Sequence, residues 1–143
     1  MIDVHPTIED VDPFEAVSVA RTASAVWGSN GNDSSEFNRP RDVVVGVSND
    51  VYVADTFNHR IQKFDKNGNF LLQWGEYGLI DQSDNLSGAL NEPWGLGVSD
   101  DGMVYVADTW NHRIVKFDSD GEIVDSWGSF GDGVDLYSMW GPR

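Results

Sequence analysis

The chain has 143 residues, of which 40% are apolar, with six tryptophans and no cysteine. This length suits one domain with a real core, and the missing cysteines exclude disulfides and thiolate metal sites. The formal net charge of −15 makes nucleic acid a poor partner, because such a surface repels phosphate backbones.

The N-terminal residues predict two segments. Residues 1–13 contain many acids and two prolines, which favour a loose lead-in. The next stretch, Phe14–Trp27, is apolar and rich in β-formers, and it ends in Trp-Gly. Residues 14–36 are therefore predicted to be the last strand or strands of a degenerate repeat plus a linker. No signal peptide and no membrane span are expected, and the cellular compartment stays open.

One stretch of the chain occurs twice. Val51–Gly75 returns as Val104–Gly128 at an offset of 53 residues, and 16 of the 25 positions are identical. Such a period indicates a solenoid, a propeller or an array. The predicted organisation is one repeat over 37–75, a linker insert over 76–89, a second repeat over 90–128, and a linker with the start of a third repeat over 129–143.

Each repeat contains four short β segments in the same order. The first is Val43–Val47 in one repeat and Gly95–Val98 in the other. It is followed by VYVAD, by RIQKFD or RIVKFD, and by NFLLQW or EIVDSW. Turn sequences such as Asn-Gly and Asp-Gly separate them and are typical of hairpins. The prediction is an all-β chain whose repeats are four-stranded antiparallel meanders, as in propeller blades.

These motifs resemble the NHL-repeat β-propeller family. Shared features are Pro-x-Gly, VYVAD, Thr-x-Asn-His-Arg-Ile, KFD and a terminal Trp-Gly, over roughly residues 27–143. One departure is Arg41-Asp42, where the second repeat has Trp94-Gly95. The resemblance implies a six-bladed propeller of about 300 residues. The chain would then be a fragment with partial repeats at each end, its copies would assemble into a ring, for example a trimer, or the fold would be an open wedge with unusual capping.

The motif Asp-Thr-x-Asn-His-Arg contains the residues that most resemble a catalytic or metal site. Because it occurs in both repeats, we expect a structural role, with each Asp accepting hydrogen bonds from turn N–H groups and from the Arg. Metal binding and acid–base catalysis are the weaker alternatives, and we predict no catalytic residue, metal or cofactor. Replacing Asp108 by Ala is predicted to cost about 1–3 kcal/mol. The motif residues are Asp55, Asn58, His59, Arg60, Asp108, Asn111, His112 and Arg113.

Binding is expected at the rim of the blades that carries the long linkers and the loops between the second and third strands. Long loops on a rigid sheet often carry function, and aromatic side chains are frequent interface anchors. The alternative is that these aromatics fill gaps between blades. The predicted binding residues are Tyr77, Trp94, Trp110, Phe130, Tyr137 and Trp140.

Two functions fit these expectations. The first is a scaffold that binds a protein or peptide through the linker rim. The alternative, implied by the family resemblance, is part of a metal-dependent propeller enzyme similar to an amidating lyase or a lactonase. RNA binding, which some NHL propellers perform through a basic face, is disfavoured by the charge of −15.

Overall fold

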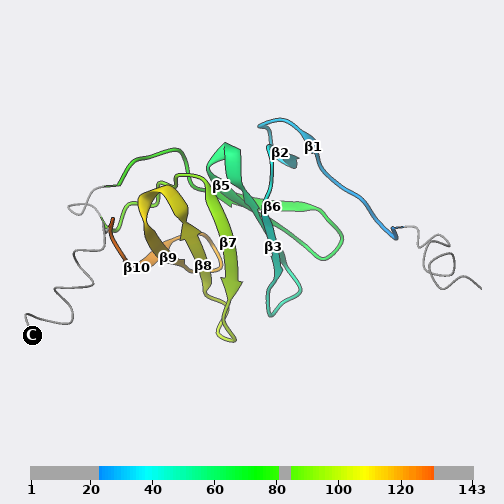
Figure 1. Cartoon of the computed structure of the whole chain (residues 1–143). Coiled ribbons are helices and arrows are strands. Elements are labelled where there is room, and N and C mark those ends of the chain that lie inside the picture. The colour runs from blue at the N-terminus through cyan, green and yellow to red at the C-terminus, as the bar shows by residue number, and fades with distance from the viewer. Residues whose placement is uncertain (1–22, 81–84, 131–143) are drawn as a thin grey trace, which may run out of the picture.

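The computed structural model describes residues 23–80 and 85–130 and is almost entirely β (Figure 1). Its two four-stranded antiparallel sheets each follow chain order, so each is a meander, as predicted. Blade 1 consists of β3 (Asp42–Val45), β4 (Val51–Asp55), β5 (Arg60–Phe64) and β6 (Phe70–Trp74). Blade 2 consists of β7 (Pro93–Val98), β8 (Val104–Asp108), β9 (Arg113–Phe117) and β10 (Ile123–Trp127).

The first strand of each blade differs from its predicted bounds. β3 ends at Val45 rather than Val47, because the Gly46 N–H donates to Asp50 O at 2.8 Å and closes the turn there. β7 begins at Pro93 rather than Gly95, since Pro93 pairs with Asp108 before a bulge. β3 and β7 lie side by side in the middle of the molecule (Figure 1).

Short elements occur in the connections. A two-residue parallel ladder joins β1 (Ser29–Asn30) to β2 (Glu36–Phe37) within the first linker, and the sequence did not predict it. Two 3₁₀ turns, η2 (Thr56–Asn58) and η3 (Thr109–Asn111), follow the second strands of the blades. No helix among the described residues is long and apolar enough to cross a membrane.

The structure describes only the last part of the predicted N-terminal segments. Residues 23–28 contain no strand, so the strand predicted to end at Trp27 is absent over that part, and residues 14–22 lie outside the described residues. Trp27 nevertheless lies against Gly68, in the turn between β5 and β6. Trp74 lies in the same way against Gly121, in the turn between β9 and β10. The terminal tryptophan of one unit therefore packs on the turn glycine of the next.

The larger of two hydrophobic clusters lies between the two blades. Tyr52, Ala54 and Ile61 of blade 1 are buried against blade 2. The Trp74 ring lies 5.8 Å from the Phe117 ring, measured between centroids. Burying each large apolar side chain contributes about 1.5–3 kcal/mol. The facing residues of blade 2 and its linker are Leu90, Val104, Val106, Val115 and Phe117.

The departure of blade 1 from the repeat has a structural reason, because both of its residues reach across to blade 2. The Asp42 carboxylate accepts the Leu96 N–H at 2.7 Å, and the Arg41 guanidinium stacks over the Trp94 ring at 4.1 Å. At the opposite rim, Lys63 donates to Ser119 O at 2.9 Å. The blades are thus joined by polar contacts at both rims as well as by the core.

Candidate functional site

The repeated motif holds the linkers in place. In blade 1 the buried Asp55 carboxylate accepts hydrogen bonds from the Asn38 N–H at 2.8 Å and from Arg60 Nε at 2.7 Å. The Arg60 guanidinium also donates to the carbonyl oxygens of Asn32, Asp33 and Glu36. A buried charge pair of this kind is stable only when its remaining hydrogen-bonding groups are satisfied. Here the linker backbone satisfies them.

Blade 2 repeats this arrangement. Asp108 accepts from Arg113 Nε at 2.8 Å, from Asn111 at 2.9 Å and from the Asn91 N–H at 2.7 Å. Arg113 donates in turn to three carbonyl oxygens of the linker between the blades, each at 2.8 Å: those of Asn85, Ser87 and Ala89. This geometry favours the structural role predicted for the motif, since its polar groups are engaged with the protein itself.

The two motif histidines end the 3₁₀ turns in a left-handed backbone conformation, with φ of 55° at His59 and 56° at His112. His59 Nδ1 accepts the backbone N–H of Glu92 at 3.1 Å, where the chain passes by on its way into β7. The Tyr77 ring packs edge-on against His59 at 4.9 Å. His59 and Tyr77 thus form a seat for the backbone of the linker bend at Glu92, whose φ is 52°.

His112 and Phe130 form the same pair in blade 2, with ring centroids 4.8 Å apart. Within residues 23–80 and 85–130, no hydrogen bond to the His112 ring is found. The His112 seat therefore corresponds to the one that the linker into the next blade fills at His59.

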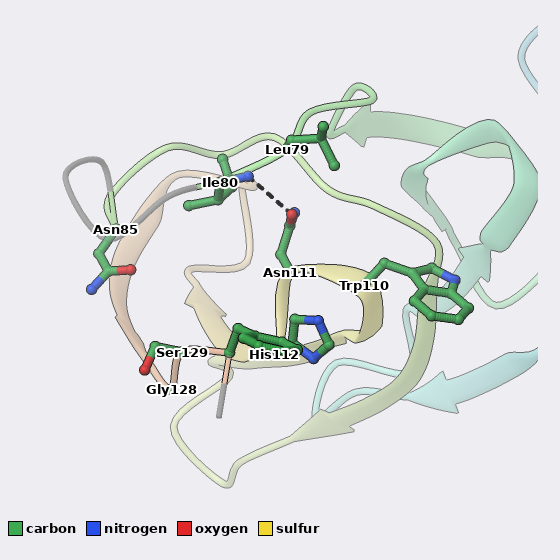
Figure 2. Close-up of a pocket in the computed structure, with 9 residues that line it drawn as sticks. Leu79, Ile80, Asn85, Trp110, Asn111, His112, Gly128 and Ser129 are labelled. Carbon is green, nitrogen blue, oxygen red and sulfur yellow. Dashed lines mark hydrogen bonds between the residues drawn. The ribbon is translucent and has the colours of Figure 1, made fainter. Parts of the chain in front are cut away.

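A pocket of about 230 Å³ lies at this second seat. In Figure 2 the linker carrying Leu79, Ile80 and Asn85 arches over the end of blade 2, with Asn111 and His112 beneath it. Asn111 Oδ1 accepts the Ile80 N–H at 3.0 Å, the dashed line in Figure 2, and so fixes the linker above the pocket. The full lining comprises Leu79, Ile80, Asn85, Trp110, Asn111, His112, Gly128, Ser129 and Phe130.

A second feature of the same rim is an arginine strip, made of Arg39, Phe57, Arg41 and Trp94. Besides its contact with Trp94, Arg41 lies 5.9 Å from the centre of the Phe57 ring, and Arg39 lies 5.0 Å from that ring. Trp110 Nε1, at the pocket, donates to the Glu92 carboxylate at 2.8 Å. Because Glu92 is two residues from Trp94, this bond connects the pocket to the strip.

The predicted rim residues divide between these features. Trp110 and Phe130, with exposed fractions of 55% and 65%, line the pocket together. Tyr77, at 60%, packs on His59, and Trp94, at 43%, lies beneath Arg41. The predicted residues Tyr137 and Trp140 lie outside the described residues.

Sequence reasoning missed the other half of the rim. Leu79, Ile80 and Asn85 come from the linker insert, whose sequence has no counterpart elsewhere in the chain to reveal its fold. Arg39 and Phe57 were also missed. A signal for the strip did exist, because Arg41 is a departure from the repeat and now proves to bridge the blades.

The opposite rim, formed by the short turns, has a different chemistry. The Asn69 side chain donates to Asp65 and holds the pKa of that carboxyl below its usual value, and Ser99 does the same for the pKa of Asp101. Both groups therefore stay ionised to lower pH. Among the described residues, no three His, Cys, Asp or Glu side chains gather as a metal site. The acids on these turns are Asp50, Asp65, Asp100, Asp101, Asp118, Asp120 and Glu122.

Comparison with known proteins identifies the repeat. The NHL repeat model matches residues 37–64 and 90–117. Protein brain tumor of Drosophila melanogaster is 49% identical over 55 residues, which is 38% of this chain and 5% of that protein. Peptidyl-glycine alpha-amidating monooxygenase B of Xenopus laevis is 40% identical over 92 residues, 61% of this chain and 10% of that protein. Human NHL repeat-containing protein 2 is 38% identical over 78 residues, 52% of this chain and 11% of that protein.

Solved structures resemble the chain at low sequence identity. Virginiamycin B lyase from Staphylococcus aureus aligns with a TM-score of 0.45 and 16% identity, over 62% of this chain and 26% of that one. A putative exported protein from Bacteroides fragilis aligns with a TM-score of 0.48 and 16% identity, over 76% of this chain and 27% of that one. The chain thus spans only a small part of each curated relative. The two matches to the NHL repeat model overlap the two four-stranded meanders, so the chain contains two NHL repeats, each built as a propeller blade.

Proposed function

We propose that this NHL segment is a binding module that holds an extended segment of a protein or peptide on its linker rim. The observation that carries the proposal is the repeated seat. In blade 1, His59 accepts the backbone N–H of Glu92, in the bend of the linker that leads into β7. In blade 2, His112 and Phe130 have the same arrangement beside an apolar pocket. A peptide ligand would place one apolar side chain in the pocket, against Phe130 and Leu79.

The composition of the rim supports this proposal. Tryptophan, tyrosine and arginine dominate binding energy in protein interfaces, and the rim exposes Trp94, Trp110 and Tyr77. Leu79, with 73% of its surface exposed, adds an apolar contact at the mouth of the pocket. A volume of about 230 Å³ suits one side chain rather than a whole small molecule.

Peptides selected by display on the immobilised protein test this function. We expect enriched 12-residue peptides to bind with micromolar affinity in solution. Phe130→Ala and Leu79→Ala should each weaken binding about tenfold, since each removes an apolar contact to the ligand. Titration calorimetry of one selected peptide gives the affinities.

The matched control is Leu71→Ala, which truncates an exposed leucine of β6 that does not line the pocket. This variant should bind as the wild type does. Failure to enrich any peptide, or equal binding by all three variants, would contradict the proposal.

The proposed module is not an enzyme, and the alternative is part of a metal-dependent propeller enzyme. The similarity to peptidyl-glycine alpha-amidating monooxygenase motivates this alternative, although the chain covers only 10% of that relative. Metal analysis of the purified chain distinguishes the two, because stoichiometric, tightly bound zinc or calcium would favour the enzyme.

We also place the two blades within a larger, six-bladed propeller. The face of blade 1 that blade 2 covers carries Tyr52, Ala54, Ile61, Lys63 and Trp74. The outer face of blade 2 carries the identical residues 53 positions later: Tyr105, Ala107, Ile114, Lys116 and Trp127. A surface that already binds one blade suits another, supplied by a longer chain or by a second copy, as in the predicted trimer.

A further inference from the structure

Resting on this function, we propose that the ligand carries a carboxylate side chain, an aspartate or glutamate, and that Arg39 and Arg41 bind it. The arginine strip would form a second subsite on the linker rim, besides the pocket of Figure 2. The ligand would then be an extended peptide with an apolar side chain at the pocket and one acidic side chain at the strip.

The first support is that these two arginines keep their hydrogen-bonding capacity. Arg60 and Arg113 are buried, and each is paired with an aspartate and with linker carbonyls. Arg39 and Arg41 are exposed, and among residues 23–80 and 85–130 neither makes a salt bridge.

The neighbouring acids do not occupy them. The Asp42 carboxylate accepts the N–H groups of Val43 and Leu96, one on each oxygen. The Glu92 carboxylate accepts the indole N–H of Trp110. Both acids therefore have other partners, and the two guanidinium groups can meet an external anion.

The second support is that the aromatic rings position the guanidinium groups in advance. Arg41 stacks over Trp94 at 4.1 Å and Arg39 over Phe57 at 5.0 Å. A guanidinium over an aromatic ring loses freedom of movement but keeps its N–H edge for a partner. That planar edge matches the two oxygens of a carboxylate. The guanidinium groups of the strip are therefore already oriented for a carboxylate, unlike charged side chains that move freely on a surface.

The net charge of the protein favours a ligand with a single carboxylate over one with many negative charges. A nucleic acid or a run of acidic residues would bring many negative charges toward a protein that is itself strongly negative. A ligand with a single carboxylate is attracted by two nearby arginines, and it brings only one negative charge that the rest of the protein repels. The Trp110–Glu92 hydrogen bond connects this subsite to the pocket, so one short peptide can reach both.

The experiment is peptide display on two proteins, the wild type and the Arg39→Gln/Arg41→Gln double variant. We expect wild-type selections to enrich one aspartate or glutamate at a fixed spacing from an apolar residue. The double variant should lose the acidic preference and keep the apolar one. Changing that acid to its amide in a selected peptide should weaken binding to the wild type about tenfold, and binding to the double variant hardly at all.

Two further variants serve as controls. Lys66→Gln removes a positive charge from the turn rim and should leave the preference for an acidic residue intact. Arg39→Lys/Arg41→Lys should keep this preference only in part, since lysine lacks the planar guanidinium fork.

Peptides enriched without an acidic residue would overturn this inference and leave the binding function standing. No enrichment at all would reject the binding function itself. A decameric uridine RNA that binds the wild type but not the Arg39→Gln/Arg41→Gln variant would assign the arginines to phosphate and also overturn the inference.

Discussion

At the scale of single residues, the buried aspartates favour the structural role predicted for the motif that most resembles a catalytic site. Asp108 is fully buried, and its carboxylate organises two side chains and one backbone N–H of the incoming linker. The sequence predicted this role from recurrence alone. The identity of the linker carbonyls that complete the network was not predictable, because they are brought to Arg113 by a loop with no repeat pattern.

Asp108→Ala should therefore cost about 3–5 kcal/mol of unfolding free energy, more than the 1–3 kcal/mol expected from lost hydrogen bonds alone. The added cost arises because Arg113, only 4% exposed, would keep its charge without its partner. Urea denaturation followed by tryptophan fluorescence measures the change. Asp120→Ala, at an exposed turn position, is the control and should change stability by less than about 0.5 kcal/mol; a similar loss in both variants would contradict the buried-pair account.

At the scale of strands and turns, the elements with local signals were predictable. Alternating apolar residues and Asn-Gly or Asp-Gly turns indicated all eight blade strands to within about two residues. The β1–β2 ladder was missed because its pairing depends on how the linker lies against Arg60 and Gln62, whose side chains bind Glu36 O. The pocket was missed for a related reason, since its lining comes from segments that are distant in sequence.

The glycines in the turns between the third and fourth strands make the packing contact with the tryptophan that ends the preceding unit. Gly121 has φ of +82°, and a Cβ there would lie 2.7 Å from the Trp74 ring. Gly121→Ala should thus combine backbone strain with a clash against Trp74 and destabilise the protein by about 2–4 kcal/mol. Thermal and urea unfolding would give the value.

The matched control is Gly102→Ala. Gly102 has a similar φ of +85°, but a Cβ added there would lie 3.9 Å from its nearest neighbour. An alanine at this position would therefore suffer backbone strain without a clash. We expect a cost of about 1–2 kcal/mol there. If the two substitutions proved equally destabilising, the packing of Trp74 on Gly121 would not contribute as described.

At the scale of the whole molecule, stability should depend on how many blade interfaces exist. In repeat proteins, the free energy of folding is approximately a sum over units and their nearest-neighbour interfaces. The described residues contain one complete interface, between blades 1 and 2, while Trp127 on the outer face remains 47% exposed. Trp127 thus marks the place where the next interface would begin.

A chain lengthened by a second copy of residues 76–128, inserted after Gly128, should unfold at a higher urea concentration than the original. The added blade would cover Trp127 and bring a glycine turn against it, as Gly121 does for Trp74. The emission maximum of the Trp127 indole should move to shorter wavelength. The same insertion in a Trp127→Ser background is the control and should stabilise less; an equal gain in both would mean that the new blade does not dock on this face.

The contacts of Arg60 and Arg113 with the linkers allow the linker sequences to vary during evolution. Both arginines hold the linkers mainly by main-chain carbonyl oxygens, which every residue type provides. Substitutions in these loops therefore leave the anchorage intact while they alter the exposed side chains. The rim can acquire new specificities at little risk to folding, much as antibody loops diversify on a constant framework.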